Sequence, residues 1–354
     1  MDFSIYKNAR VLVTGHTGFK GSWLLALLDY LGADVIGYAL EPDTTPSLFN
    51  LMEGDQKCNS IIADIRDADR LQQVIEEFCP DFIFHLAAQP LVRRSYHVPV
   101  ETFEVNGMGT VYLLEAVRKL GKPTTVVLIT TDKVYENPES GTPFVETDRL
   151  GGHDPYSTSK AVSELIIDSY RKSFFAVENK ENLTGIASCR AGNVIGGGDW
   201  ALDRLVPDIV RAFYENQTVT LRNPNAVRPW QHVLEPLVGY LLLGTKLKQN
   251  PHKYSEAFNF GPFPEDMISV EKMTRLALEA WGGGSYQIKS NPGQLHEAGL
   301  LTLSIDKARE ELSWTPKLNS QQAIQWSIEW YKKQHLGKDV TQLMRDQIEQ
   351  YLAL

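Results

Sequence analysis

The stretch RVLVTGHTGFKG, residues 10–21, contains the pattern that determines the fold class. It begins with a short β-rich run, continues with three glycines, and leads into WLLALLDYLG, which has the length and terminal glycine of a buried helix. A strand, a glycine turn and a helix in this order let the backbone approach a pyrophosphate at the helix N-terminus. We therefore expect Gly15, Gly18, Phe19 and Gly21 to bind a dinucleotide; the alternative is a tight glycine turn without a ligand.

The alternation of strand and helix continues far beyond this turn. Strand candidates are DVIGYAL, NSIIADI, PDFIFHLAA and TTVVLITT, and the helical segments DADRLQQVIEEF and MGTVYLLEAVRKL separate them. Such alternation predicts an α/β fold with a Rossmann-type, doubly wound parallel sheet. After about Ala191, Gly, Pro and Trp become more frequent. We expect a first, dinucleotide-binding domain at residues 1–190, rejoined by about 231–260, and a smaller α/β substrate domain over most of 191–354.

Composition excludes several classes of function. A net charge of −9 over 354 residues disfavours nucleic acid as a partner, because polyanion binding needs a basic face. Cys58, Cys79 and Cys189 are widely spaced, which predicts neither a metal site nor disulfides and favours a reducing, cytoplasmic compartment. The N-terminal MDFSIYKNAR has no apolar core, and no apolar run is long enough to cross a bilayer. We expect a soluble protein without membrane contact.

The end of the second strand candidate bears on the choice of dinucleotide. It reads Tyr38-Ala39-Leu40-Glu41, so the acidic residue that would bind the ribose hydroxyls comes a residue or two late. No Arg or Lys follows in ALEPDTTPS, so a 2′-phosphate has no evident partner. We therefore expect NAD rather than NADP, and the displaced acid predicts a weakly held, exchangeable cofactor.

A second motif, YSTSK, places Tyr156 and Lys160 four residues apart. Asp154 and Pro155 before it are typical of an N-cap and a first helical residue, so both side chains share one helix face. An ammonium beside a phenol lowers its pKa from about 10 and makes it a usable base. By itself the pair is common on solvated helix faces, but together with the glycine turn it favours a catalytic role.

The order of several motifs resembles one family. VTGHTGFKG, HLAAQ, VNGMGT, TTDKVYEN, YSTSK and NVIGGGD follow one another as in the extended short-chain dehydrogenases/reductases that act on nucleotide sugars. TTDKVYEN, GGGDWALDRLVPDIVRA and VRPWQHVLEP resemble most the members that dehydrate CDP-glucose, and the similarity extends through SIDKAREELSWTPK. The resemblance implies a Rossmann domain, a smaller sugar-nucleotide domain, NAD, and a homodimer built through helices of the first domain.

The resemblance also implies roles for the residues after TVVLI. Thr131 matches a residue that holds the sugar 4-hydroxyl, Asp132 the acid that protonates the departing 6-hydroxyl, and Lys133 the base that removes the C5 proton. Loss of the C5 proton requires a ketone at C4, so oxidation by NAD, with Tyr156 as the base, has to come first. Lys133 must be neutral to act, which requires burial or a neighbouring cation. The alternative for Asp132 and Lys133 is a solvated turn pair.

The other expected site residues belong to cofactor or substrate. For the cofactor we expect, besides the glycine turn, Asp64, Ile65, Leu86, Ala87, Ala88, Asn106, Tyr156 and Lys160. By the resemblance Arg228 contacts the pyrophosphate of the sugar nucleotide and Asn193 its diphosphate or sugar, with Arg204 a candidate by position. A salt bridge between domains is the alternative for Arg228. Two other functions stay open, namely an epimerase or dehydratase of another nucleotide sugar and an NAD-binding regulator without catalysis.

Overall fold

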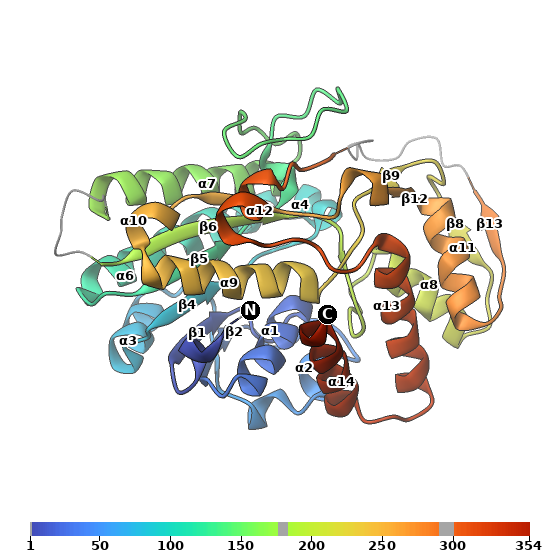
Figure 1. The fold of residues 1–354 in the computed structure, drawn as a ribbon, viewed down its shortest axis with the longest axis horizontal. Coiled ribbons are helices and arrows are strands. Elements are labelled where there is room, and N and C mark those ends of the chain that lie inside the picture. The colour runs from blue at the N-terminus through green and yellow to red at the C-terminus, as the bar shows by residue number, and fades with distance from the viewer. Residues whose placement is uncertain (1, 176–182, 290–300) are drawn as a thin grey trace.

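A seven-stranded parallel sheet forms the centre of the molecule in the computed structural model, which describes residues 2–175, 183–289 and 301–354 (Figure 1). Its strand order is β11-β6-β5-β4-β1-β2-β3, and every neighbouring pair is parallel. The strands are β1 (Arg10–Thr14), β2 (Asp34–Ala39), β3 (Asn59–Ile62), β4 (Phe82–His85), β5 (Thr125–Ile129), β6 (Gly185–Ala191) and β11 (Ala257–Phe260). The order reverses between β1 and β4, and open α/β sheets bind ligands at the carboxyl ends of the strands beside such a point.

Helices cover both faces of this sheet because its central strands are apolar on both sides. In β1, Val11 and Val13 belong to one buried cluster, while Leu12 belongs to another on the opposite face. The first cluster includes side chains of α1 (Phe19–Tyr30), α9 (Leu234–Gln249) and α14 (Val340–Ala353). The second includes side chains of α3 (Ala68–Phe78), α6 (Gly109–Leu120) and α7 (Pro155–Phe174). The expected doubly wound α/β fold is therefore confirmed.

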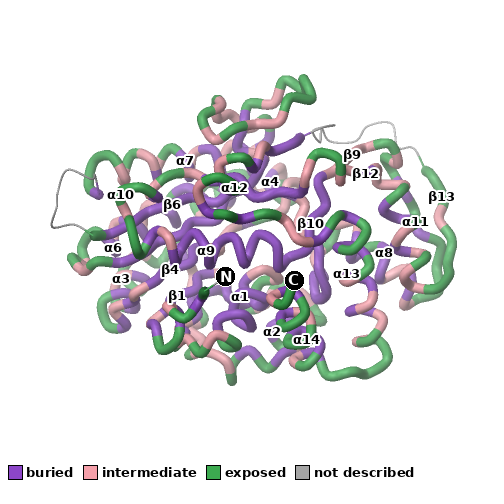
Figure 2. The backbone as a smooth tube through the Cα atoms, viewed as in Figure 1, coloured by how far each residue is buried: buried purple, intermediate pink, exposed green. Residues whose placement is uncertain are grey.

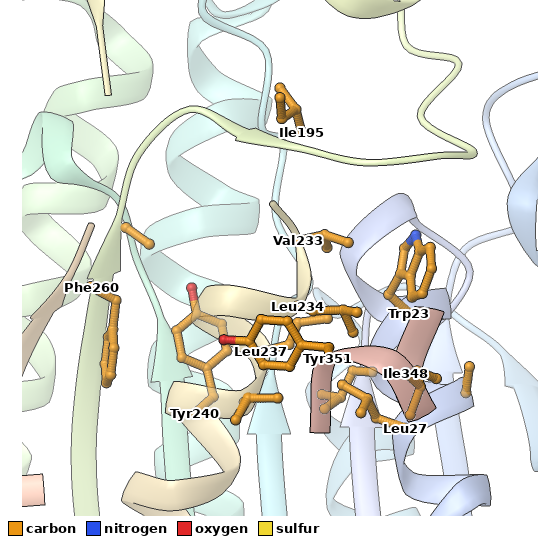
Figure 3. Close-up of a cluster of buried hydrophobic side chains, with 14 of the residues drawn as sticks. Trp23, Leu27, Ile195, Val233, Leu234, Leu237, Tyr240, Phe260, Ile348 and Tyr351 are labelled. Carbon is orange, nitrogen blue, oxygen red and sulfur yellow. The ribbon is translucent and has the colours of Figure 1, made fainter. Parts of the chain in front are cut away.

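The larger cluster is built where α1, α9 and α14 meet. Figure 3 shows Trp23 and Leu27 of α1, Leu237 of α9 and Tyr351 of α14 gathered at this point. Helix α9 is buried on nearly all sides, as the continuous purple of its backbone in Figure 2 indicates. A helix that is apolar all round has to lie inside the fold.

A smaller lobe lies at the right of Figure 1 and combines helices with short strands. Its helices are α8 (Leu205–Tyr214), α11 (Val270–Trp281) and α13 (Ser320–His335). Its strands form the parallel pair β8 (Val219–Leu221) and β13 (Tyr286–Ile288) and the antiparallel pair β9 (Val227–Arg228) and β12 (Ile268–Ser269). A further parallel pair joins β7 (Val194–Ile195) to β10 (Gln231–His232), and α12 (Asp306–Leu312) packs against β11 and α9. Domain limits at residues 190 and 231–260 stay predictions, although α9 packs against β5 and β6.

The structure contains elements that the sequence pattern did not indicate. Strands β6 and β11 were not among the five expected; β6 reads GIASCRA, with few β-branched or aromatic residues, yet all seven of its residues are buried. Between α5 (Pro99–Phe103) and α6 the chain forms a π-helix, η3 (Glu104–Met108). Short helices are η1 (Ser4–Tyr6), α2 (Leu48–Leu51), η2 (Gly54–Gln56), α4 (Val92–His97), η4 (Asp132–Val134), α10 (Pro251–Tyr254) and η5 (Pro264–Asp266). Within the described ranges, no helix is long and apolar enough to cross a membrane.

Glu235 in the first turn of α9 connects this helix to the C-terminal segment. Its carboxylate accepts hydrogen bonds from the backbone N–H groups of Lys317 and Leu318 and from the Tyr351 hydroxyl. Burial raises the pKa of Glu235 from its usual 4.5 to about 7. The unfolded chain releases this proton near its ordinary pKa and the folded chain only near neutrality, so this group's contribution to stability falls as the pH rises between them.

We expect the stability difference between the wild type and Glu235→Gln to be larger at pH 5 than at pH 8. The amide cannot ionise, so only the wild type loses stability over this range, by an upper bound of roughly 3 kcal/mol. Urea unfolding at pH 5, 6.5 and 8 measures this difference. A difference that stays constant or grows with pH would contradict the proposed titration of Glu235.

Candidate active site

The glycine turn between β1 and α1 is packed against the backbone at the end of β4. Gly15 has a φ of 75°, and a Cβ there would lie 2.7 Å from the nitrogen of Ala87. A Cβ on Gly21 would lie 2.0 Å from the carbonyl oxygen of Gly15, so this glycine lets helix and turn touch. A Cβ on Gly18, by contrast, would have no protein atom within 3.4 Å. Gly18 is also the N-cap of α1 without a side-chain cap, so the protein leaves room and backbone donors for an anion at this turn.

His16 occupies the space between this turn and the second strand. Its Nε2 lies 2.8 Å from Ser60 Oγ, and a Cβ on Gly37 would overlap the imidazole at 2.3 Å. Burial lowers the pKa of His16 to about 4, so the ring is neutral. Leu40 and Glu41 beyond β2 are exposed. The expectation of a weakly held NAD at this end of β2 stays a prediction.

The other residues expected at the cofactor lie along the same edge of the sheet. Asp64 follows β3 and forms an ion pair of 2.6 Å with Arg66, and Ile65 is buried against Gly109. Leu86, Ala87 and Ala88 follow β4, the first two directly behind Gly15. Asn106, in the π-helix, exchanges hydrogen bonds with the backbone of Gln89 and donates to Ser159 Oγ at 2.8 Å. π-Helical turns are frequent at functional sites.

Helix α7 begins as the sequence predicts, and it brings Tyr156 and Lys160 into the interior. The Asp154 carboxylate accepts a hydrogen bond from the Ser157 N–H at 2.9 Å, and Pro155 occupies the first turn. Tyr156 and Lys160 are both buried. The Lys160 ammonium donates to the Ile129 carbonyl at 3.1 Å. Burial, followed by the nearby Lys20 ammonium, lowers the pKa of Lys160 to about 8.

The pKa of Tyr156 departs from the expectation based on the sequence. Burial raises it from 10 to about 12, while a hydrogen bond with the Thr131 side chain opposes the rise. Lys160 does not produce the expected fall towards neutrality, because its ammonium is directed to Ile129. The expectation that the Lys160 ammonium lowers the pKa of Tyr156 is therefore wrong for this structure.

Residues 131–134 follow β5 and face Tyr156; they are called the acid–base loop below, after the roles predicted for Asp132 and Lys133. The Thr131 hydroxyl donates to the Asp132 carboxylate at 2.9 Å, and Asp132 is 2% exposed. This carboxylate fits only because Gly192 has no side chain, since a Cβ there would lie 1.8 Å from Asp132 Oδ2. Lys133 is partly exposed, and among the described residues its ammonium has no ion-pair partner within 4 Å. The solvated-turn alternative does not describe a buried Asp132.

A cleft of about 1730 Å³ opens in front of these groups, between the sheet edge and the smaller lobe. Its walls include Thr131, Asp132, Lys133 and Tyr156, together with Asn193, Arg204 and Arg228. The Arg204 guanidinium bonds to Asp199 at 2.8 Å and its charge lowers the pKa of Tyr156 slightly. Arg228 donates to the carbonyl of Val227, and Asn193 has a φ of 40°. The structure therefore brings the expected catalytic and substrate residues together, with Lys160 behind Tyr156.

Lys20 is a site residue that was not expected from the sequence. It lies in the wall of the cleft, where burial and the Arg204 charge lower its pKa to about 8, while Asp132 and Asp199 act in the opposite direction. A signal was present in the sequence, because a cation in the first turn of a helix opposes the helix dipole. Here two nearby carboxylates, those of Asp132 and Asp199, favour the charged form of Lys20.

Comparisons with known proteins agree with this geometry. The sequence model of a family described as GDP-mannose 4,6 dehydratase matches residues 12–326. The chain is 45% identical to CDP-glucose 4,6-dehydratase of Salmonella typhimurium, over 100% of this chain and 99% of that protein. It is 27% identical to dTDP-glucose 4,6-dehydratase of Streptomyces antibioticus, over 91% of this chain and 92% of that protein. The crystal structure of Thermus thermophilus UDP-glucose 4-epimerase in complex with NAD superimposes with a TM-score of 0.78 and 26% identity, covering 91% of this chain and 99% of that one.

The family match spans most of the chain, and the full-length similarity to a dehydratase includes the segments that form the cleft. The protein is thus a member of the GDP-mannose 4,6-dehydratase family.

Proposed function

We propose that this protein is an NAD-dependent lyase that converts CDP-glucose and yields CDP-4-dehydro-6-deoxyglucose and water. The observation that carries the proposal is the presence of Asp132 and Lys133 in the same cleft as Thr131 and Tyr156. Of these four side chains, oxidation at C4 needs only Thr131 and Tyr156. Elimination of water also needs an acid and a base, which Asp132 and Lys133 can provide. The 45% identity to a CDP-glucose 4,6-dehydratase supports cytosine as the base of the nucleotide sugar.

The glycine turn fits the pyrophosphate of NAD. Gly15 and Gly21 are required for the turn's own packing, and the room at Gly18 lies at the uncapped N-terminus of α1. Partial positive charge at a helix N-terminus suits an anion. Asp64, Ile65, Leu86, Ala87, Ala88 and Asn106 would hold the rest of the dinucleotide along the sheet edge. When bound, NAD+ would supply the redox chemistry of the reaction, as acceptor and later donor of one hydride.

The first proton transfer belongs to Tyr156. Its phenol takes the proton of the 4-hydroxyl, and Thr131 holds that hydroxyl. Because burial raises the pKa of Tyr156 to about 12, the phenolate needs positive charge close by. The Arg204 guanidinium supplies such a charge, because it lowers the pKa of Tyr156. Lys160, one turn along the same helix, would add a second charge if its ammonium turned from the Ile129 carbonyl to the phenolate.

The elimination belongs to the acid–base loop. The ketone at C4 acidifies the C5 hydrogen, and the Lys133 amine removes it. The C6–oxygen bond breaks as Asp132 transfers a proton to the leaving hydroxyl, and one water molecule departs. After hydride return to C6, Lys133 gives a proton back to C5. Asp132 and Lys133 therefore exchange protons with the substrate in a cleft whose wall already contains the redox residues.

The diphosphate of the substrate carries charge that the cleft can neutralise. Arg204 and Arg228 lie in the wall of the smaller lobe, and Asn193 lies at the end of β6. A guanidinium offers two parallel N–H donors to a phosphate, which suits this role. These three residues would hold the nucleotide half of the substrate, while the sugar faces Tyr156.

NMR of the sugar protons tests this function directly. We expect the purified protein with NAD+ to produce a new C6 methyl signal from CDP-glucose, and not from dTDP-, GDP- or UDP-glucose. Substrate deuterated at C4 should transfer the label to C6, because the same hydride returns. A methyl signal from another nucleotide sugar would show that this sugar, and not CDP-glucose, is the substrate. Inversion at C4 without a methyl signal would show that the protein is an epimerase. No reaction with any of them would favour a non-catalytic, NAD-binding regulator.

Gly192→Ala tests the role of Asp132 without touching its carboxylate. A Cβ at residue 192 would overlap Asp132 Oδ2, so the acid must move, and we expect a loss of dehydration by roughly a hundredfold. Gly261→Ala is a matched control, because a Cβ there meets no atom within 3.7 Å. Formation of the methyl product measures both variants, and circular dichroism checks their folding. A Gly192→Ala enzyme with wild-type turnover would remove Asp132 from the mechanism.

We further propose that two copies associate through the helices of the first lobe. Val100 of α5, Met108 of η3 and Leu165 of α7 are 70%, 42% and 59% exposed, and Phe103 is 37% exposed. Helices α5 and α7 and η3 pack against one another, so these apolar side chains lie on neighbouring elements. Grouped apolar exposure of this kind is typical of a protein interface. A homodimer would bury it.

A charge placed in this surface should break the dimer. Leu165→Glu puts a carboxylate where the partner would have to desolvate it, so we expect the dimer dissociation constant to rise by more than about tenfold. Leu336→Glu, at a residue 71% exposed beyond α13, is the control. Light scattering over a concentration series gives the masses. A wild type that stays monomeric, or a Leu165→Glu dimer as stable as the control, would refute this interface.

A further inference from the structure

A buried ion pair between α7 and β6 lies directly behind the acid–base loop. Glu164 is on α7, one turn after Lys160, and Arg190 is on β6, two residues before Gly192. Their side chains are 3% and 5% exposed and meet at 2.9 Å. Neither side chain lines the cleft in the described part of the chain. The proposed chemistry gives neither residue a role.

The carboxylate of this pair holds the residue before the loop. The Thr130 hydroxyl donates to Glu164 Oε1 at 2.5 Å and also lies 3.2 Å from the Cys189 carbonyl. Glu164 Oε2 accepts hydrogen bonds from Ser188 and Arg190. The position of Thr130, and with it the start of the loop, is therefore set by α7 and β6 together.

The guanidinium of the pair holds the residue after the loop. Arg190 Nη1 donates to the Tyr135 hydroxyl at 2.8 Å, and that hydroxyl donates to Asn259 Oδ1 at 2.7 Å. The guanidinium also lies 5.0 Å from the centre of the Tyr135 ring, and this ring stacks on Phe144. One ion pair thus contacts both residues that flank positions 131–134.

We propose that Glu164 and Arg190 are positioning residues that clamp both ends of the acid–base loop and keep Asp132 and Lys133 in register with Tyr156. The geometry has a particular consequence because Glu164 and Tyr156 belong to the same helix. A movement of α7 that displaces Tyr156 also moves the clamp. Oxidation at C4 and elimination at C5 and C6 therefore act on the sugar in the same bound orientation. This inference rests on the proposed dehydration, in which two proton donors or acceptors must reach C5 and C6 after C4 is oxidised.

Removing two hydroxyls tests the clamp while leaving the ion pair in place. Thr130→Val removes the hydroxyl that bonds to Glu164, and Tyr135→Phe removes the hydroxyl that bonds to Arg190 and Asn259. Both changes nearly keep the side-chain shape. In single turnovers of CDP-glucose with NAD+, we expect the double variant to form NADH within about threefold of the wild-type rate, but to eliminate water at least about tenfold more slowly. NADH absorbance should therefore accumulate and then decay slowly. The KM for CDP-glucose should stay within about twofold, because both hydroxyls bond to side chains that do not line the cleft.

The controls remove equivalent hydroxyls elsewhere. Tyr6 and Thr245 both donate to the carbonyl of Leu241 from buried positions, so Tyr6→Phe/Thr245→Val deletes a tyrosine and a threonine hydroxyl away from the cleft. We expect this variant to keep the wild-type ratio of the two steps. Thr130→Ser retains the hydroxyl. With Tyr135 unchanged, this variant should therefore eliminate water at about the wild-type rate.

Hydrogen exchange provides a measure that does not require turnover. In the Thr130→Val/Tyr135→Phe variant, amides of residues 130–137 should exchange faster, while those of α7 and β5 stay protected. Equal slowing of both chemical steps, the same loss in the control variant, or unchanged exchange at 130–137 would overturn the clamp. A wild type that forms neither NADH nor a methyl product would refute the proposed function instead, and the exchange comparison would still decide whether the clamp exists.

Discussion

The site depends on the backbone contact between the glycine turn after β1 and the segment after β4. At this contact a Cβ on Gly15 would overlap the nitrogen of Ala87, so the two segments touch without side chains between them. Since β1, β4, β5 and β6 are parallel neighbours, their carboxyl ends all lie at one edge. The dinucleotide turn, the acid–base loop and the segment that contains Gly192 and Asn193 are therefore brought together by strand direction alone. Helix α7 and the smaller lobe add further side chains from elsewhere.

Burial determines the electrostatics of this edge. It raises the pKa of Tyr156 to about 12 and lowers the pKa values of Lys160 and Lys20 to about 8, which means that it disfavours the charged form of every one of them. Near neutral pH the neutral and charged forms of Lys20 and Lys160 are therefore close in free energy. Two ion pairs keep their charges, Glu164 with Arg190 and Asp199 with Arg204.

Local sequence patterns predicted the parts of the structure that depend on neighbours along the chain. The glycine turn, the Asp154 cap and five strands follow from spacing and residue type within short windows. Strand β6 was missed because its small and polar residues are buried by packing on both faces, which no local pattern reports. The pKa of Tyr156 was misjudged for a similar reason, since Lys160 finds a carbonyl on β5 that lies 31 residues away in sequence. No local pattern predicted a role for Glu164 and Arg190, because that role depends on contacts with Thr130 and Tyr135, which are distant in sequence.

Small residues opposite large polar ones explain how this edge can be both dense and reactive. The His16 ring lies where a Cβ on Gly37 would be, and the Asp132 carboxylate lies where a Cβ on Gly192 would be. A buried carboxylate needs room, donors and a fixed position at once, and the glycine supplies the room while Thr131 supplies a donor. The position then has to come from outside the loop. Helix α7 and strand β6 contact both flanking residues, Thr130 through Glu164 and Tyr135 through Arg190. These contacts link the position of Asp132 to the helix that contains Tyr156.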